Sequence, residues 1–218
     1  MLSQAEENYI KAIFSIELSS NKTVSTTLIA KSLKMKASSV TDMIKKLADK
    51  DLVNYEKYKG VSLTSEGKQI ALKIVRKHRL WEVFLMDKLD YKWDEVHDLA
   101  EQLEHIKSNT LIDKLDAFLE FPTHDPHGDP IPDKEGNIEQ HKNVMLSSIE
   151  INNSCTVIGV KDSSTAFLKF LDSANIQLGS VLKVISKEDF DNSVIIENKS
   201  ISKSISNQIS KNLFVNKL

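Results

Sequence analysis

The most informative local pattern of the chain lies in residues 24–48. These residues read Val24-Ser25-Thr26-Thr27-Leu28-Ile29-Ala30-Lys31-Ser32-Leu33-Lys34-Met35-Lys36-Ala37-Ser38-Ser39-Val40-Thr41-Asp42-Met43-Ile44-Lys45-Lys46-Leu47-Ala48. Residues 24–33 predict a short helix with a serine and threonine start. Residues 34–36 predict a tight turn, and residues 38–48 predict a second helix whose apolar positions recur at helical spacing. This order is typical of a helix-turn-helix, whose second helix enters the major groove of DNA.

The outer face of the second helix carries residue types that suit this placement. Short polar groups stand at its N-terminal end, where they can reach base edges, and lysines follow that can meet phosphates. We therefore predict a DNA-binding surface in this part of the chain. Its residues outside the wing are Thr26, Lys36, Ser38, Ser39, Thr41, Asp42, Lys45 and Lys46.

A β-hairpin is predicted directly after the second helix. Its strands are residues 52–55 and 61–64, and the basic tip between them ends at a glycine. A hairpin in this position is the wing of a winged helix, and Lys57, Tyr58 and Lys59 at its tip can rest on the phosphate backbone. The alternative interpretation is a surface hairpin in an α+β enzyme.

Positive charge is concentrated in the same region. Residues 31–79 hold thirteen Lys or Arg and five Asp or Glu, so this segment carries +8 and the remaining chain −10. A basic segment in an acidic protein favours a polyanionic partner for that segment, here double-stranded DNA. A chance excess of solvated lysine is the alternative.

The composition is typical of a globular protein, with 40% hydrophobic and 28% charged residues among 218. No stretch approaches the roughly 20 apolar residues that a membrane helix needs, so we expect no membrane partner. The acidic N-terminus lacks the basic and apolar regions of a signal peptide, which predicts a cytoplasmic location. The single cysteine, Cys155, excludes an intramolecular disulfide and a cysteine-rich zinc site.

Residues 97–105 predict a helix with one face made of imidazole and carboxylate side chains. That face has no Lys or Arg, whereas an ordinary solvated helix face mixes both signs. A long helix predicted over residues 65–89 adds two such donors one turn apart. Nitrogen and oxygen donors without thiolate suit Mn²⁺, Fe²⁺, Co²⁺ or Zn²⁺, although each histidine alone is more often structural. The six residues are His78, Glu82, His97, Glu101, Glu104 and His105.

The remaining sequence predicts a third helix over residues 111–119 and then a proline-rich connection. Short strands at close spacing follow from residue 146, with one short helix among them, which indicates a small β-barrel. The predicted fold is therefore mainly α with β, in three domains. These are a winged helix-turn-helix in residues 1–64, a helical metal-binding and dimerisation domain in residues 65–141, and the barrel in residues 142–218.

Several spaced motifs resemble a known family, the metal-dependent transcriptional repressors of the diphtheria toxin repressor class. This class includes iron-dependent regulators and manganese transport regulators, and the resemblance extends over essentially the whole chain, with an SH3-like barrel at the C-terminus. The motifs are Tyr55-Glu56-Lys57-Tyr58-x-Gly60, Leu63-Thr64-x-x-Gly67, Arg76-Lys77-His78-Arg79-Leu80-x-Glu82, Val96-His97-Asp98-x-x-Glu101-x-x-Glu104-His105 and Pro126-His127-Gly128-x-Pro130-Ile131-Pro132.

The resemblance implies two neighbouring metal sites. Carried over by position, the regulatory site uses Asn8, Glu101, Glu104 and His105. The ancillary site uses His78, Glu82 and His97, and His78 shares in the regulatory site of some manganese-type members. Asp125 and His127 match further positions that ligate metal in members with a barrel, and Asp162, early in the barrel, is an additional candidate.

The resemblance also bears on the metal. Iron-type members have cysteine at position 101 and manganese-type members a carboxylate, so Glu101 favours Mn²⁺, with Fe²⁺ possible. Two departures stand in residues 4–18, which predict an N-terminal helix. Asn8 replaces the usual Met or Asp, and Lys11 stands where some manganese regulators have a ligating Glu.

The expected function is a metal-dependent repressor that binds a palindromic operator as a homodimer and controls metal-ion homeostasis. In this interpretation a metal ion joins Asn8 to the Glu101–His105 segment and fixes the position of the winged helix. Two alternatives belong to other classes. One is a metal-independent winged-helix regulator that senses an organic ligand, and the other is a metal-dependent hydrolase, for which the sequence shows no His-Glu-x-x-His motif.

Overall fold

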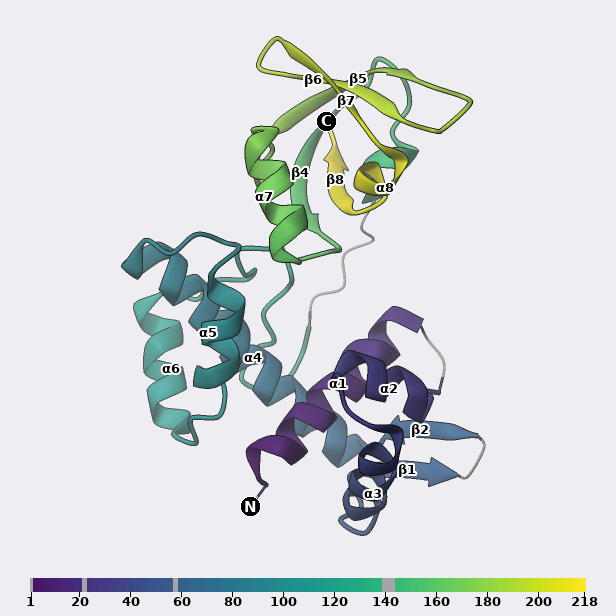
Figure 1. Cartoon of the computed structure of the whole chain (residues 1–218). Coiled ribbons are helices and arrows are strands. Elements are labelled where there is room, and N and C mark those ends of the chain that lie inside the picture. Colours follow the sequence, from purple (N-terminus) through teal and green to yellow (C-terminus); the bar gives the residue numbers. More distant parts are fainter. Residues whose placement is uncertain (1, 21–22, 57–58, 139–143) are drawn as a thin grey trace. The chain divides into compact units, whose positions relative to one another are not determined.

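The computed structural model describes residues 2–20, 23–56, 59–138 and 144–218, and Figure 1 labels their helices and strands. The chain forms two compact units, and three of their boundaries fall inside helices. The first unit comprises Met1–His78, Glu101–Asp113 and Pro132–Asn137, and the second comprises Arg79–Ala100, Lys114–Ile131 and Ile138–Leu218.

The first unit contains the predicted helix-turn-helix. Its helices are α1 (Gln4–Ser20), α2 (Thr26–Ser32) and α3 (Ala37–Ala48). The Ser25 hydroxyl caps α2 by accepting a hydrogen bond from the Leu28 amide at 3.2 Å. Lys34 adopts a φ of 53° in the turn that separates α2 from α3. The predicted helix-turn-helix is therefore present, but α2 is shorter than the helix predicted over residues 24–33, and α3 begins one residue earlier than expected.

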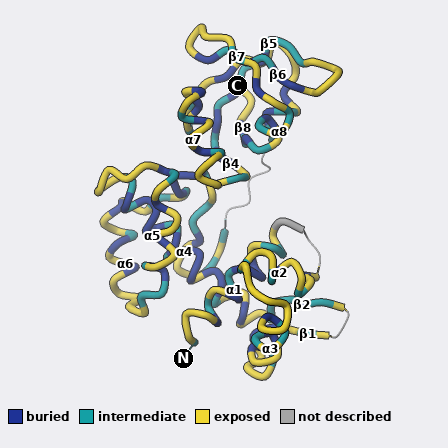
Figure 2. Tube along the Cα trace, viewed as in Figure 1, coloured by how far each residue is buried: buried dark blue, intermediate teal, exposed yellow. Residues whose placement is uncertain are grey.

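Aliphatic side chains hold these three helices together. Ile10 and Ile13 of α1, Ile29 of α2, and Ile44 and Leu47 of α3 are fully buried. Each such side chain contributes about 1.5–3 kcal/mol of hydrophobic free energy to folding. The helical spacing of these residues leaves the opposite side of α3 to solvent, as the exposed stretches of α3 in Figure 2 show.

The predicted wing is an antiparallel hairpin of β1 (Val53–Glu56) and β2 (Gly60–Leu63), in which Val53 pairs with Leu63. Its bounds differ by one residue from those predicted. Val24 forms an additional antiparallel bridge to Val61, which joins the hairpin to the residues before α2. The tip residues Lys57 and Tyr58 lie outside the described residues.

Three helices follow the hairpin: α4 (Ser65–Leu89), α5 (Val96–Leu103) and α6 (Asn109–Phe118). The expectation of one continuous helical face from His97 to His105 is wrong, because α5 ends at Leu103. The Ile106 amide donates to the Leu103 carbonyl in a turn, and the Ser108 hydroxyl then caps α6. Glu104 therefore leaves the exposed face and is fully buried.

The second unit includes the predicted C-terminal β domain, a six-stranded antiparallel sheet in the order β3-β8-β4-β5-β6-β7. The core of this unit contains Trp93, which precedes α5, together with apolar residues of the sheet and of α7. The elements are β3 (Val144–Met145), a 3₁₀ turn η1 (Leu146–Ser148), β4 (Ser154–Val160), α7 (Thr165–Ser173), β5 (Val181–Lys187), β6 (Val194–Asn198), β7 (Ile201–Ile205), α8 (Asn207–Ser210) and β8 (Leu213–Lys217).

Membrane-spanning character is absent from the part of the chain that the structure describes. No helix there combines the length and the apolar character that crossing a bilayer requires.

Candidate functional site

Glu82 of α4 stands at the centre of a group of imidazole and carboxylate side chains. Its carboxylate is almost completely buried, with 1% of the residue exposed. Oε1 lies 3.3 Å from Nδ1 of His97, and Oε2 lies 3.4 Å from Nδ1 of His127. One carboxylate therefore serves two imidazoles that come from different segments of the second unit.

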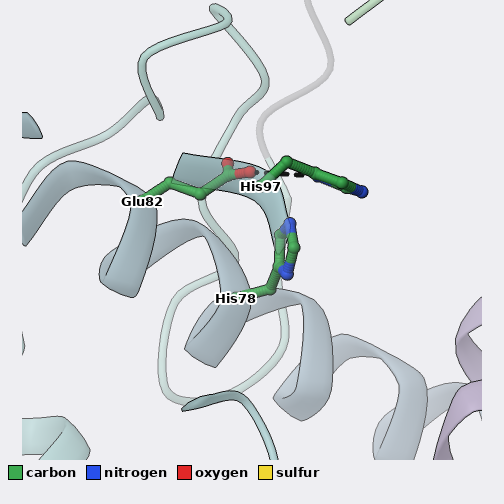
Figure 3. Close-up of side chains that lie close together, drawn as sticks. All are labelled: His78, Glu82 and His97. Carbon is green, nitrogen blue, oxygen red and sulfur yellow. Dashed lines mark hydrogen bonds and ion pairs between the residues drawn. The ribbon is translucent and has the colours of Figure 1, made fainter. Parts of the chain in front are cut away.

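His78 lies one turn before Glu82 on the same continuous helix. Figure 3 shows both side chains beside His97, which approaches from α5. His78, Glu82 and His97 each offer a ligand atom, and these atoms lie within 4.8 Å of one another. A divalent cation binds donors at about 2.0–2.3 Å, so atoms at this mutual separation can share one ion.

A buried loop brings a second set of donors to Glu82. The ligand atoms of Glu82, Asp125 and His127 also lie within 4.8 Å of one another, and all three residues are buried. Oδ1 of Asp125 accepts hydrogen bonds from the amides of His127 at 2.8 Å and Asp129 at 3.0 Å, which closes the loop on itself. Nε2 of His127 lies 2.8 Å from the Trp93 carbonyl, and this contact leaves Nδ1 for Glu82.

Arg79 supports this loop from α4. Its guanidinium donates to the Pro130 carbonyl and lies 3.5 Å from carboxylate oxygens of both Asp125 and Asp129. Sequence reasoning did not assign Arg79 a role, although the residue stands inside the motif that contains His78 and Glu82. Its partners are some fifty residues further along the chain, so helical periodicity carries no signal of the contact.

Protonation within this group is strongly perturbed. Burial, reinforced by the charges of Glu82 and Asp129, raises the pKa of Asp125 to about 7. Burial alone would lower the pKa of His127, but the hydrogen bond and charge of Glu82, with the charge of Asp125, raise it to about 9. Asp125 and His127 thus hold protons that a bound divalent cation would displace.

A second cluster surrounds Glu104 within the first unit. Oε2 of this buried carboxylate lies 2.6 Å from Nδ1 of His78 and 2.6 Å from Nζ of Lys11. The same ammonium lies 3.5 Å from Oε1 of Glu101, whose side chain is 51% exposed. Burial alone would raise the pKa of Glu104, but His78 and Lys11 hold it below its usual value. Glu104 therefore already has two partners that come from the chain itself.

The contacts of α1 with this cluster differ from those expected. Glu7 and Lys11 make its ion pairs with the segment after α5, and His105 Nδ1 lies 2.6 Å from Oε2 of Glu7. Asn8 is exposed on the same helix. Sequence reasoning gave Glu7 no role and noted Lys11 only as a departure from the family pattern. The sequence signal for these contacts was the spacing of Glu7 and Lys11, an acidic and a basic residue one turn apart on α1.

Asp162 is not part of the groups of potential metal ligands found among the described residues. It lies in the loop between β4 and α7, where its Oδ1 accepts a hydrogen bond from the Ser164 amide at 2.9 Å. This contact shapes the start of α7 and engages one of the two carboxylate oxygens of Asp162.

The two candidate clusters differ in how well they suit a divalent cation. The Glu82 group offers two sets of three imidazole and carboxylate ligands that share the buried Glu82, so its donors fit Mn²⁺ or Fe²⁺. The Glu101–Glu104–His105 set does not fit as it stands. Its carboxylates contact an ammonium, and its imidazole is paired with Glu7.

The candidate DNA-binding surface lies on α3 and the wing. Ser38, Ser39, Asp42 and Lys45 are exposed on α3, as is Lys36 just before it. The partly buried Thr41 hydroxyl donates to the Ala37 carbonyl, and Thr26 is also partly buried at the start of α2.

Ion pairs involve two of the lysines assigned to this surface. Nζ of Lys46 lies 3.2 Å from the buried Glu6 carboxylate, so this lysine also fastens α3 to α1. Lys59 pairs with Glu56 across the base of the wing tip at 2.6 Å.

Fold and site together define a class of protein: a winged-helix DNA-binding module joined to helices with a candidate metal centre. Three family profiles match the chain in order. These are the iron-dependent repressor N-terminal DNA-binding domain over residues 1–61, the iron-dependent repressor metal-binding and dimerisation domain over residues 64–133, and the FeoA domain over residues 144–217.

Individual relatives agree with these profiles. An uncharacterised HTH-type transcriptional regulator of Methanocaldococcus jannaschii is 37% identical over 119 residues, which cover 55% of this chain and 95% of the relative. The regulator MntR of Oceanobacillus iheyensis is 34% identical over 115 residues, which cover 53% of this chain and 77% of the relative. A solved manganese-dependent transcriptional repressor in complex with manganese is 34% identical, with a TM-score of 0.88 over 98% of this chain and 100% of the other.

The chain belongs to the iron-dependent repressor family. The resemblance inferred from the motifs and the predicted fold class are both confirmed, including the C-terminal domain. The family consists of transcriptional repressors, which are not enzymes, so the hydrolase alternative loses its support.

Proposed function

We propose that this protein is a metal-dependent transcriptional repressor that binds operator DNA as a homodimer and controls metal-ion homeostasis. The buried Glu82 carboxylate carries the proposal, because it belongs to two sets of three potential ligands, and within each set the ligand atoms lie within 4.8 Å of one another. Membership of a family of metal-dependent repressors supports it. The exposed face of α3 supplies the module through which such a protein reads DNA.

The residues that hold the ion in this proposal are Glu82, His97, His127 and Asp125, with His78 on the same helix as Glu82. Mn²⁺ is the favoured ion and Fe²⁺ the alternative, because oxygen donors of this hardness and imidazoles suit both. When bound, the ion supplies positive charge to a cluster of carboxylates that are otherwise protonated or paired with histidines. Arg79 and the Trp93 carbonyl orient the loop that contributes Asp125 and His127.

Dimer formation is supported by exposed aromatic residues near the end of α6. Phe118 and Phe121 are 60% and 67% exposed, which is unusual for large apolar side chains. A two-fold dimer presents two copies of α3, and two half-sites of a palindromic operator can then be bound together. The metal-independent regulator of an organic ligand remains the competing proposal.

Operator binding with and without metal tests the proposal. Duplexes selected from random-sequence DNA in the presence of Mn²⁺ are titrated by fluorescence anisotropy, either with Mn²⁺ or with a chelator. We expect Mn²⁺ to tighten binding at least about tenfold, a coupling of about 1.4 kcal/mol. Glu82→Gln should remove most of this increase, because it takes away the carboxylate that two imidazoles share.

Glu188→Gln is the matched control, since Glu188 is exposed and lies in the C-terminal sheet domain. This variant should respond to Mn²⁺ as the unchanged protein does. Equal affinity with Mn²⁺ and with chelator in the unchanged protein would exclude metal dependence and favour the organic-ligand regulator.

A further inference from the structure

Lys11 contacts the carboxylates of both Glu101 and Glu104 in the Glu104 cluster through its ammonium group. Its ammonium lies 2.6 Å from Oε2 of Glu104 and 3.5 Å from Oε1 of Glu101. Its side chain is only 17% exposed, so the charge is held largely out of water. The contact joins α1 to residues about ninety positions later in the chain, all within the first unit.

The burial of Glu104 explains why a cation is needed there. A fully buried carboxylate is costly unless charged partners and hydrogen bonds compensate it. His78 provides one such partner and Lys11 the other, both on Oε2. The second oxygen, Oε1, is buried without a hydrogen-bond partner among the described residues. This oxygen lies 4.0 Å from Nε2 of His105, which is beyond hydrogen-bonding distance, so it could still coordinate an ion.

The charge on α1 determines what else the cluster can accept. The side chain of α1 that meets Glu101 and Glu104 is cationic, and the carboxylate of Glu7 is paired with His105. A divalent ion entering between Glu101 and Glu104 would lie next to an ammonium at close range. Like charges at such a separation repel strongly in a site with little solvent, so the two cations exclude each other.

We propose that Lys11 is a resident cation that replaces a metal ion between Glu101 and Glu104. Its ammonium holds α1 to the segment after α5 without metal and keeps divalent ions out of this cluster. Metal binding is thereby confined to the Glu82 group. This inference rests on the proposed function, because it specifies which part of the candidate centre responds to metal.

Counting bound Mn²⁺ on the purified full-length chain, without DNA, tests the proposal. The electron paramagnetic resonance signal of free Mn²⁺ gives the number of ions bound per chain. Lys11→Glu should bind one ion more per chain than the unchanged protein, because a ligand then replaces a competing charge. Lys11→Gln should gain the same ion with weaker affinity, and Lys11→Arg, which keeps the charge, should gain none.

A second substitution assigns the added ion to its site. Glu101→Gln should leave the count of the unchanged protein as it is, but remove the added ion from Lys11→Glu. The proposal is overturned if Glu101→Gln lowers the count in the unchanged protein. It is equally overturned if both Lys11→Glu and Lys11→Gln, shown by circular dichroism to be folded, bind no additional ion.

The structural part of the proposal has its own measurement in the metal-free protein. With chelator present, backbone amides of α1 should exchange with solvent at least about tenfold faster in Lys11→Gln than in Lys11→Arg, because only arginine keeps a cation against Glu104. Equal exchange in the two variants would contradict the proposal. These readouts do not involve DNA, so they separate a failure of this inference from a failure of metal-dependent operator binding.

Discussion

Glu6 shows how a single residue can connect local helix chemistry with the packing of the winged helix. Its carboxylate accepts hydrogen bonds from the amide and hydroxyl of Ser3, and the Ser3 hydroxyl accepts one from the Glu6 amide, which is a capping box at the start of α1. The same carboxylate lies 2.7 Å from Nζ of Lys50 and 3.2 Å from Nζ of Lys46. One buried acid therefore fixes both the beginning of α1 and the end of α3.

Glu6→Gln should destabilise the protein in a pH-dependent way. The Lys50 hydrogen bond, followed by the Ser3 amide and Lys46, lowers the pKa of Glu6 from its usual 4.5 to about 2. A carboxyl whose pKa is lower in the folded state stabilises that state above pH 4.5, and this contribution disappears as the pH falls toward 2. We expect a loss of about 1 kcal/mol at pH 7, measured by urea unfolding.

The difference between Glu6→Gln and the unchanged protein should shrink at pH 3, because the native carboxylate is then losing its advantage. Glu120→Gln, at an exposed position after α6, serves as the control and should change stability little at either pH. A destabilisation of Glu6→Gln that is the same at pH 7 and pH 3 would rule out this account of the charge.

At the scale of elements, the loop that carries Asp125 and His127 depends on its contact with β4. The Val160 amide donates to the His127 carbonyl at 2.9 Å. Gly128 follows with a φ of +86°, and a Cβ there would lie 2.1 Å from the Ile158 carbonyl oxygen. Only glycine allows this approach, since the backbone conformation and the space both exclude a side chain.

Gly128→Ala should therefore weaken metal binding without touching a ligand. Moving the loop away from β4 displaces Asp125 and His127 relative to Glu82, and misplaced ligands typically cost tenfold or more in affinity. Isothermal titration with Mn²⁺ measures the effect. Gly179→Ala is the control, because Gly179 has a φ of +81° but nothing within 4 Å of an added Cβ. It should lose stability while retaining its Mn²⁺ affinity, and an equal loss of affinity in both variants would contradict the role of the loop contact.

The elements themselves could largely be predicted from local pattern. The helix Ser65–Leu89 has the predicted bounds because its apolar positions recur over seven turns. The end of α5 at Leu103 was missed, since Ser108 and the turn before it decide where the chain leaves the helix. The contact of Lys11 with Glu104 was also missed. It joins residues 93 positions apart, and no local periodicity records which side chain of α1 meets which carboxylate.

For the molecule as a whole, charge is divided between the segment that we propose to meet DNA and the rest of the chain. Residues 31–79 carry +8, and the remainder carries −10. In the proposed dimer we expect this asymmetry to favour DNA at the basic segment and to disfavour it elsewhere, so that affinity depends on salt. Lys45 is the suitable probe, because Lys46 is also engaged with Glu6 and its loss would alter stability.

Lys45→Gln should reduce the salt dependence of operator binding. Each lysine–phosphate contact contributes about 0.9 to the slope of log affinity against log salt, so losing one contact in each chain of a dimer should lower the slope by about 2. Anisotropy titrations at salt concentrations from about 50 to about 200 mM measure this slope. Lys183→Gln, exposed on β5, should leave the slope unchanged. A slope unaffected by Lys45→Gln would mean that α3 does not meet phosphates at this position, and equal reductions in both variants would mean that DNA responds only to net charge.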